Sequence, residues 1–156
     1  MPDMLVKLYD LPDVSVEREK LKCSGIEIRS ALSPEKHTIM NWVRQKFGDG
    51  WASECDVAFS NKPISCFIAT ENKKLVGFAC YDSTCKDFFG PTGVCESMRG
   101  LGIGKILLVA CLQAMKEQGY AYAVIGDPGP ISFYEKAVGA TIIEGSDPGI
   151  YRGMIE

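Results

Sequence analysis

Residues 99–105, which read Arg-Gly-Leu-Gly-Ile-Gly-Lys, form the segment best suited to chemistry. They follow a predicted strand that ends near Val94 and open a predicted helix that runs to about Gln118. The first turn of a helix leaves backbone N–H groups unpaired, and the helix dipole adds partial positive charge there. Glycine also lets the backbone approach a bulky anion closely. The sequence therefore predicts that this turn binds a phosphate group.

Two common nucleotide-binding motifs do not fit the spacing of these glycines. A P-loop reads Gly-x-x-x-x-Gly-Lys-Ser/Thr, but here Arg99 stands in place of its first glycine and Ile106 in place of its hydroxyl residue. A dinucleotide fingerprint, Gly-x-Gly-x-x-Gly, would need a glycine at Lys105 or Leu107. The pattern that remains is Arg-x-x-Gly-x-Gly, at residues 99–104.

This pattern resembles the GNAT family of acyl-CoA-dependent N-acetyltransferases. Two more segments are similar to that family, in the same order: Phe-Tyr-Glu-Lys within residues 131–136, and a charged hairpin at 71–79. The resemblance covers residues 25–145 and leaves 1–24 as an N-terminal extension of one domain, 1–156. It implies an α/β fold with a mixed, strongly twisted sheet of about six or seven strands and about four flanking helices.

The resemblance also implies acetyl-CoA as the co-substrate. The glycine-rich turn would hold its pyrophosphate, and the end of the preceding strand would present backbone to its pantetheine arm. A backbone N–H near Val94 or Cys95 is expected to polarise the thioester carbonyl. Asp127 stands where the family commonly has asparagine. The implied cofactor-binding residues are Thr92, Gly93, Val94, Arg99, Gly100, Leu101, Gly102, Ile103, Gly104, Lys105 and Asp127.

Tyr134 occupies the tyrosine position of the family's Phe-Tyr-Glu-Lys segment and is predicted to be the general acid. An unperturbed tyrosine has a pKa of about 10, so it is protonated at neutral pH and can donate to a departing thiolate. Glu96, just after the strand, is the predicted base. Trp51 and Glu54 are predicted to face the acceptor.

The resemblance predicts transfer of an acetyl group to a primary amine of a small molecule. Three alternatives remain open: a module that senses acyl-CoA without turnover, an enzyme that acetylates protein N-termini or lysines, and an acyl group longer than acetyl. A thiol-release assay across many amines would distinguish them.

Composition excludes several other classes of protein. The 156 residues carry a formal net charge of −3 with no Lys or Arg run, so nucleic acid and membrane surfaces are not expected as main partners, while a homodimer remains open. Residues 1–4 lack the start of a signal peptide. The seven cysteines have no Cys-x-x-Cys spacing, and there is one histidine. This predicts no metal site and reduced, mostly buried thiols in a cytoplasmic protein.

Sequence periodicity predicts the elements that position these residues. Strands are expected at 4–8, 26–29, 65–70, 75–81, 87–94 and 120–125. Helices are expected at 33–47 (with Ser33 as N-cap), 53–59 and 103–118, with a short one beginning at 130–131.

Three other segments carry specific expectations. Residues 12–24 read as a polar connection, and residues 140–143 with 149–154 as a last hairpin. Gly90-Pro91 makes the strand at 87–94 irregular. The resemblance implies that this strand carries a bulge and parts from its neighbour, which leaves backbone groups free for the pantetheine. In the helix from 103, one stripe is predicted to face the core: Leu107, Leu108, Cys111, Leu112 and Met115.

Overall fold

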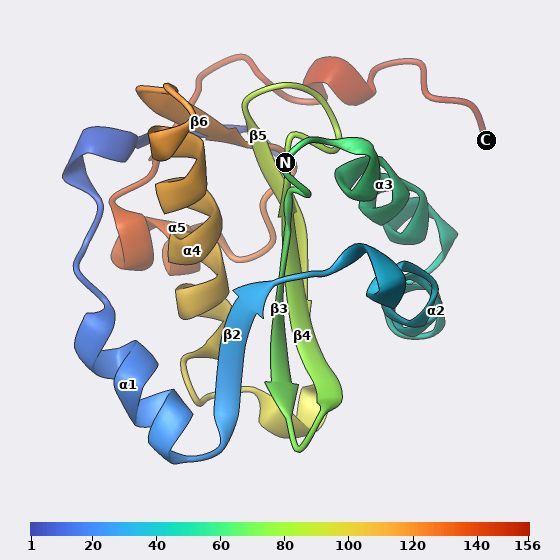
Figure 1. Ribbon diagram of the computed structural model, residues 1–156. Coiled ribbons are helices and arrows are strands. Elements are labelled where there is room, and N and C mark those ends of the chain that lie inside the picture. The colour runs from blue at the N-terminus through green and yellow to red at the C-terminus, as the bar shows by residue number, and fades with distance from the viewer.

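The computed structural model describes residues 1–156, and its centre is a seven-stranded mixed sheet (Figure 1). Across the sheet the strand order is β2-β3-β4-β5-β6-β1-β7. All neighbouring pairs are antiparallel except β5 and β6, which run parallel. The strands are β1 Met4–Lys7, β2 Ile26–Ser30, β3 Cys66–Glu71, β4 Lys74–Tyr81, β5 Phe88–Val94, β6 Tyr122–Ile125 and β7 Thr141–Ile142. The predicted α/β fold and its strand number are confirmed.

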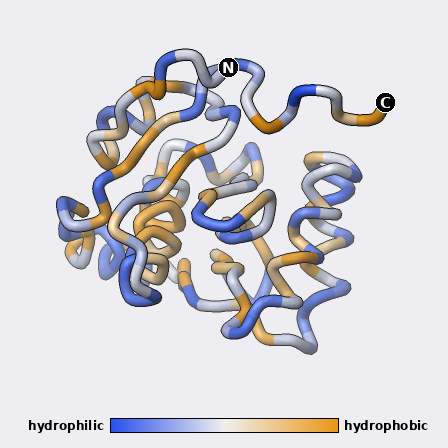
Figure 2. Tube along the Cα trace, turned by 90° about the horizontal axis from the view of Figure 1, so that it is seen from above, coloured by the Kyte–Doolittle hydropathy of each residue, from blue (hydrophilic) through white to orange (hydrophobic).

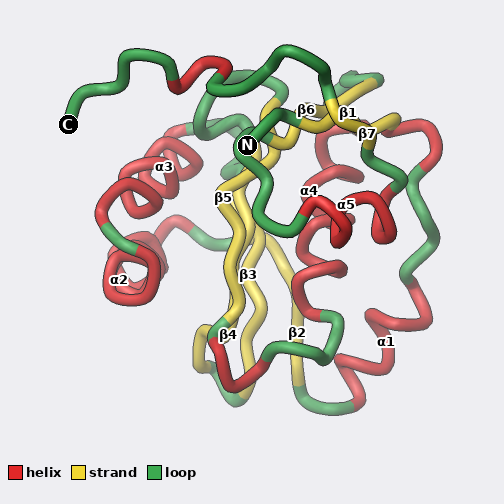
Figure 3. The backbone as a smooth tube through the Cα atoms, turned by 180° about the vertical axis from the view of Figure 1, so that it is seen from behind, coloured by secondary structure: helices red, strands yellow, loops and turns green.

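Five helices cover the two faces of the sheet (Figure 3). One face is covered by α2 and α3, and the other by α1, α4 and α5. Each face has its own apolar core, with 26 buried residues in the larger and 10 in the smaller. None of the helices combines the length and apolar character that crossing a membrane would require. The helices are α1 Ser15–Cys23, α2 Lys36–Phe47, α3 Asp49–Ser60, α4 Ile103–Glu117 and α5 Ile131–Val138.

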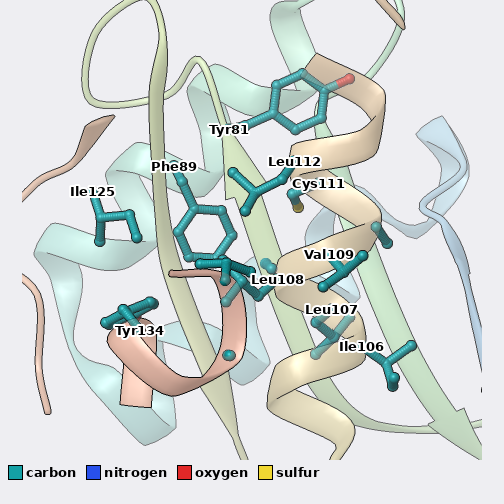
Figure 4. Close-up of a cluster of buried hydrophobic side chains, with 14 of the residues drawn as sticks. Tyr81, Phe89, Ile106, Leu107, Leu108, Val109, Cys111, Leu112, Ile125 and Tyr134 are labelled. Atoms are coloured by element: carbon teal, nitrogen blue, oxygen red, sulfur yellow. The ribbon is translucent and has the colours of Figure 1, made fainter. Parts of the chain in front are cut away.

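Helix α4 is the centre of the larger core. Its predicted core stripe is confirmed, because all five of those side chains are fully buried. Figure 4 shows four residues of the stripe beside Phe89 and Tyr134. The helix ends as predicted: Gly119 has a φ of 103°, and the Tyr120 N–H donates to the Met115 carbonyl at 3.2 Å.

The strand predicted at 4–8 is confirmed as β1, so these N-terminal residues are part of the sheet. Strand β1 lies between β6 and β7, with Met4 opposite both Ile125 and Ile142. The predicted last hairpin was wrong, because β7 pairs with β1 and residues Gly149–Tyr151 form a 3-10 turn. Figure 2 shows the last residues running past the N-terminus, where the Met1 ammonium bonds to Asp147 at 3.2 Å.

Residues 12–24 contain helix α1 rather than a polar connection. The carboxylate of Asp13 accepts the Ser15 N–H at 2.9 Å, which satisfies one free donor at the helix start. Arg18 Nη2 donates to the Ile28 carbonyl at 2.7 Å, and Leu21 is the buried residue of the helix. Because Leu21 is the one apolar side chain that this helix buries, the sequence shows no apolar stripe.

Two other helix starts differ from the prediction. A 3-10 turn, Ser33–Glu35, precedes α2, and its N-cap is Leu32 rather than Ser33: the Leu32 N–H donates to the Glu35 carboxylate at 2.8 Å. Helix α3 begins at Asp49 rather than Ser53. Gly48, with a φ of 100°, is the one residue between α2 and α3.

Candidate functional site

Strands β5 and β6 separate after a short stretch of pairing. Their parallel ladder contains only Phe88 opposite Val124 and Phe89 opposite Ile125, whereas β5 continues to Val94 along β4. Residues 90–94 therefore have no strand partner on the β6 side. This is the parting that the resemblance implied, and it opens backbone groups of β5 to a ligand.

The irregularity predicted at Gly90-Pro91 is a bulge against β4. Ala79 is opposite Thr92 and Tyr81 is opposite Phe89, so one residue of β4 faces two of β5. A bulge bends its strand and disrupts the ladder locally. In addition, Pro91 has no N–H to donate.

The backbone N–H and C=O groups of β5 point to one side of the strand or the other. The Cys95 N–H donates to the Val76 carbonyl on β4 at 2.8 Å. Because successive residues of an antiparallel strand turn their N–H and C=O to opposite sides, Val94 and Thr92 turn theirs toward the gap beside β6. Of the two N–H groups expected to polarise a thioester, that of Cys95 is already bonded, so the expectation rests on that of Val94.

The glycine-rich turn carries a run of free donors. The backbone N–H groups of residues 100–105 have no acceptor in the protein. Gly100 and Gly102 both have a φ of 86°, and Gly102 is the N-cap of α4. Since L side chains rarely adopt this conformation, glycine is required at both positions. The donors and the dipole of α4 together form an anion site.

Arg99 lies at the entrance of this turn. Its side chain is exposed, and its Nε donates to the Val94 carbonyl at 3.2 Å. This bond ties the turn to the end of β5 and leaves the terminal guanidinium nitrogens free to bind an anion. Lys105 is half-buried in the first turn of α4, and Leu101 is exposed.

Helix α5 meets the same region from the other side. A Cβ added to Gly104 would lie 3.9 Å from both the Phe133 ring and the Val94 side chain, so α4, α5 and β5 converge there. The ring of Tyr134 packs edge-on against Phe89, with centroids 6.4 Å apart (Figure 4). Phe89 marks the point where β5 and β6 part. Tyr134 therefore lies near the start of the gap.

The environment of Tyr134 keeps its hydroxyl protonated. The residue is 6% exposed, and burial raises the pKa of Tyr134 to about 12. No protein group accepts a hydrogen bond from this hydroxyl, and its oxygen is not among the fully enclosed polar atoms. The hydroxyl is therefore not engaged by the rest of the protein.

Glu96 is at the other end of β5. It is exposed in a 3-10 turn, Glu96–Met98, beside the glycine-rich turn. Six residues lie between Glu96 and Phe89, the residue of β5 against which Tyr134 packs. The structure thus does not bring the two predicted catalytic residues together.

The predicted acceptor residues lie on α3. Trp51 stacks on Phe47 with ring centroids 4.9 Å apart, and Glu54 accepts a hydrogen bond from the Thr84 hydroxyl at 2.5 Å. Sequence reasoning missed Phe47, whose ring lies against Gly93 so closely that an added Cβ would be 2.4 Å away. An aromatic residue on a helix usually packs in the core, so nothing in the sequence indicated that Phe47 lies against β5.

The segment after β6 contains the acidic residue Asp127. Asp127 has a φ of 43°, and its carboxylate lies 3.4 Å from the Met1 ammonium. Sequence reasoning also missed Tyr151, whose hydroxyl would be 2.6 Å from a Cβ on Gly126. Burial, with the carboxylates of Glu54, Asp3 and Asp127 nearby, raises the pKa of Tyr151 to about 12.

Comparison with known families gives one match, to the acetyltransferase (GNAT) family over residues 36–140. Among the curated proteins, none matches the sequence of this chain.

Solved structures of GNAT proteins share the fold. A GCN5-related glucosamine N-acetyltransferase region of a fungal multi-domain GH3 β-N-acetylglucosaminidase is 14% identical, with a TM-score of 0.73 over 91% of this chain and 19% of that one. A GCN5-related N-acetyltransferase from Sphaerobacter thermophilus is 20% identical, with a TM-score of 0.71 over 91% of this chain and 48% of that one. The chain thus spans less than half the length of these two proteins.

A third structure, a GNAT family acetyltransferase from Brucella melitensis in complex with acetyl-CoA, is 18% identical, with a TM-score of 0.55 over 71% of this chain and 80% of that one. At these identities the likeness concerns the fold.

Proposed function

The chain belongs to the acetyltransferase (GNAT) family, and from this premise we propose that it transfers an acetyl group from acetyl-CoA to a primary amine of a small molecule. The observation that carries the proposal is the run of free N–H donors at 100–105, next to the parted strands β5 and β6. A pyrophosphate needs such donors, and a pantetheine arm needs an unpaired strand edge. The acetyl-CoA held by the Brucella melitensis structure supports the same ligand.

In the proposed complex each part of the cofactor has a place. The pyrophosphate binds the turn at 100–105 with Arg99 and Lys105. The pantetheine runs along the backbone of Thr92 and the N–H of Val94, since the Val94 carbonyl already accepts a hydrogen bond from Arg99. The thioester then lies near Phe89, within reach of Tyr134. The position of the turn after the end of β5, and the contact of Tyr134 with Phe89 near its start, support this direction.

Tyr134 then acts on the departing sulfur. The neutral amine attacks the thioester carbonyl, the C–S bond breaks, and the Tyr134 hydroxyl donates its proton toward the thiolate. A tyrosine with a pKa of about 12 is a weaker acid than a thiol of about 8.5, so complete transfer alone would cost about 5 kcal/mol. We therefore place the return of a proton from the new ammonium to Tyr134 in the same step, so that the amine loses the proton that the thiol gains.

The acceptor side favours a cationic amine. Glu54, Asp3 and Asp127 all act on Tyr151, so their carboxylates surround one region between α3 and the end of β6. Carboxylates attract an ammonium group and raise its local concentration. This supports a small polar amine as the acceptor, rather than an aromatic or neutral one.

The test is thiol release from acetyl-CoA with a panel of amines, polyamines, amino acids and aminoglycosides. The wild-type chain should release thiol with at least one, and Tyr134→Phe should lower kcat by 10²- to 10⁴-fold, the usual range for general acid catalysis, with acetyl-CoA binding retained. Tyr81→Phe is the matched control, because it removes another buried phenol whose partner is Gln118. Acetyl-CoA binding without release from any amine would instead indicate a sensor.

A further inference from the structure

Three cysteines that are distant in the sequence meet inside the smaller core. The Sγ atoms of Cys55, Cys66 and Cys80 all lie within 4.8 Å of one another. All three residues are fully buried, and none is in a disulfide. The sequence spacing predicted no metal site, because the three positions share no short motif.

The fold accounts for this meeting. Cys66 on β3 is paired directly with Cys80 on β4, and residues opposite each other on paired strands point to the same face. Helix α3 covers that face and contributes Cys55. Ala52 and Ala58, buried on the same helix, are small enough to let α3 approach the sheet closely.

The chemistry of the donor set restricts the ligand. The cluster contains three soft sulfur donors and no histidine or carboxylate. A structural zinc site takes four ligands, and zinc held by three thiolates would leave a net negative charge. The surrounding core is apolar and has no cation to balance that charge, so such a complex would be costly to bury.

A trivalent metalloid avoids this cost. Arsenic(III) hydroxide reacts with three thiols to give three As–S bonds and three waters: each thiol proton leaves with one hydroxide, and no atom is oxidised or reduced. The product is neutral. We propose that Cys55, Cys66 and Cys80 form a binding site for a trivalent metalloid hydroxide such as arsenite, linking α3 to β3 and β4.

Access to the three thiols depends on motion of the fold. Because all three residues are fully buried, uptake requires a local opening of α3, the helix that contributes Cys55.

The test uses the full chain, reduced with a phosphine and titrated with sodium arsenite. Native mass spectrometry should show one arsenic per chain, at a mass corresponding to arsenic minus three protons. X-ray absorption at the arsenic edge should show three sulfur neighbours and no oxygen. Arsenite should also raise the melting temperature, because it binds the folded state. Oxygen or only two sulfurs around the arsenic, or tighter binding of Zn²⁺ than of arsenite, would overturn the proposal.

Variants locate the site. Cys55→Ala is expected to weaken arsenite binding by about 100-fold or more, which is at least the effect of removing a supporting group from a metal site. Cys111→Ala is the matched control, since Cys111 is equally buried but lies in the larger core. Equal retention of arsenic by both variants would contradict the proposal. Should Cys55→Ala not fold, Cys80→Ala tests the same site from the sheet, and the spectroscopy of the wild-type chain stands independently.

Discussion

The tip of the Phe47 ring lies against Gly93, and a methyl group on that glycine would come within 2.4 Å of the ring's Cζ atom. Phe47 is the last residue of α2, and Gly93 belongs to the part of β5 that has no partner on its β6 side. The contact holds α2 against the strand that would carry the pantetheine. Trp51 stacks on the same ring, so the predicted acceptor wall depends on this contact.

Gly93→Ala should therefore destabilise the protein. We expect a loss of about 1–3 kcal/mol in the free energy of unfolding, the usual cost of overpacking, together with weaker acetyl-CoA binding. Chemical denaturation of Gly93→Ala, Phe47→Ala and the double variant measures the coupling. Because Phe47→Ala makes room for the methyl group, the double variant should be more stable than the sum of the single losses predicts. Simple additivity would mean that the ring moves aside freely.

The glycine-rich turn allows a test in which backbone strain is separated from ligand binding. Gly102 and Gly119 stand at the two ends of α4 with φ values of 86° and 103°, and neither has an atom near its added Cβ. Alanine should cost about 1–2 kcal/mol at either position, because both are left-handed. Only Gly102→Ala should also raise KM for acetyl-CoA, since Gly102 belongs to the run of free donors. An equal rise in KM in Gly119→Ala would contradict the proposal that the glycine-rich turn is the anion site.

The sequence predicted the parts of the fold that depend on local pattern. The stripe on α4 follows from helical periodicity, and the charged hairpin between β3 and β4 follows from turn chemistry. The glycine-rich turn was found for the same reason, because its glycines are adjacent in the chain. The predicted cofactor contacts of that turn remain predictions.

The features that were missed depend on contacts between distant residues. The sequence pattern predicted strand β1 at 4–8, but not that it pairs with β6 and β7, more than a hundred residues later. The three-cysteine cluster arises only when α3 lies over β3 and β4, and Tyr151 reaches the site from a segment with no regular pattern. No local signal in the sequence reports such contacts, whereas strand pairing and helix packing create them.

Asp87, at the start of β5, gives a prediction for the dependence of stability on pH. One of its carboxylate oxygens is buried without a hydrogen-bond partner. Burial, and the charge of Asp82 whose carboxylate accepts the Asp87 N–H at 2.8 Å, raise the pKa of Asp87 to about 6. The folded state thus binds a proton more tightly than the unfolded state does. Stability from this group is complete below pH 3.8 and is lost as the pH rises through about 6.

Asp87→Asn should remove this loss, since the amide is neutral at all pH values and asparagine tolerates the φ of 69° found here. Because the group is partly solvated, we expect a gain of about 1 kcal/mol at pH 7.5 and almost none at pH 3.5. Urea denaturation of both proteins at the two pH values measures the difference. A gain of the same size at pH 3.5 would show that the substitution acts on the backbone, and a loss at pH 7.5 would show that the charge of Asp87 stabilises the fold.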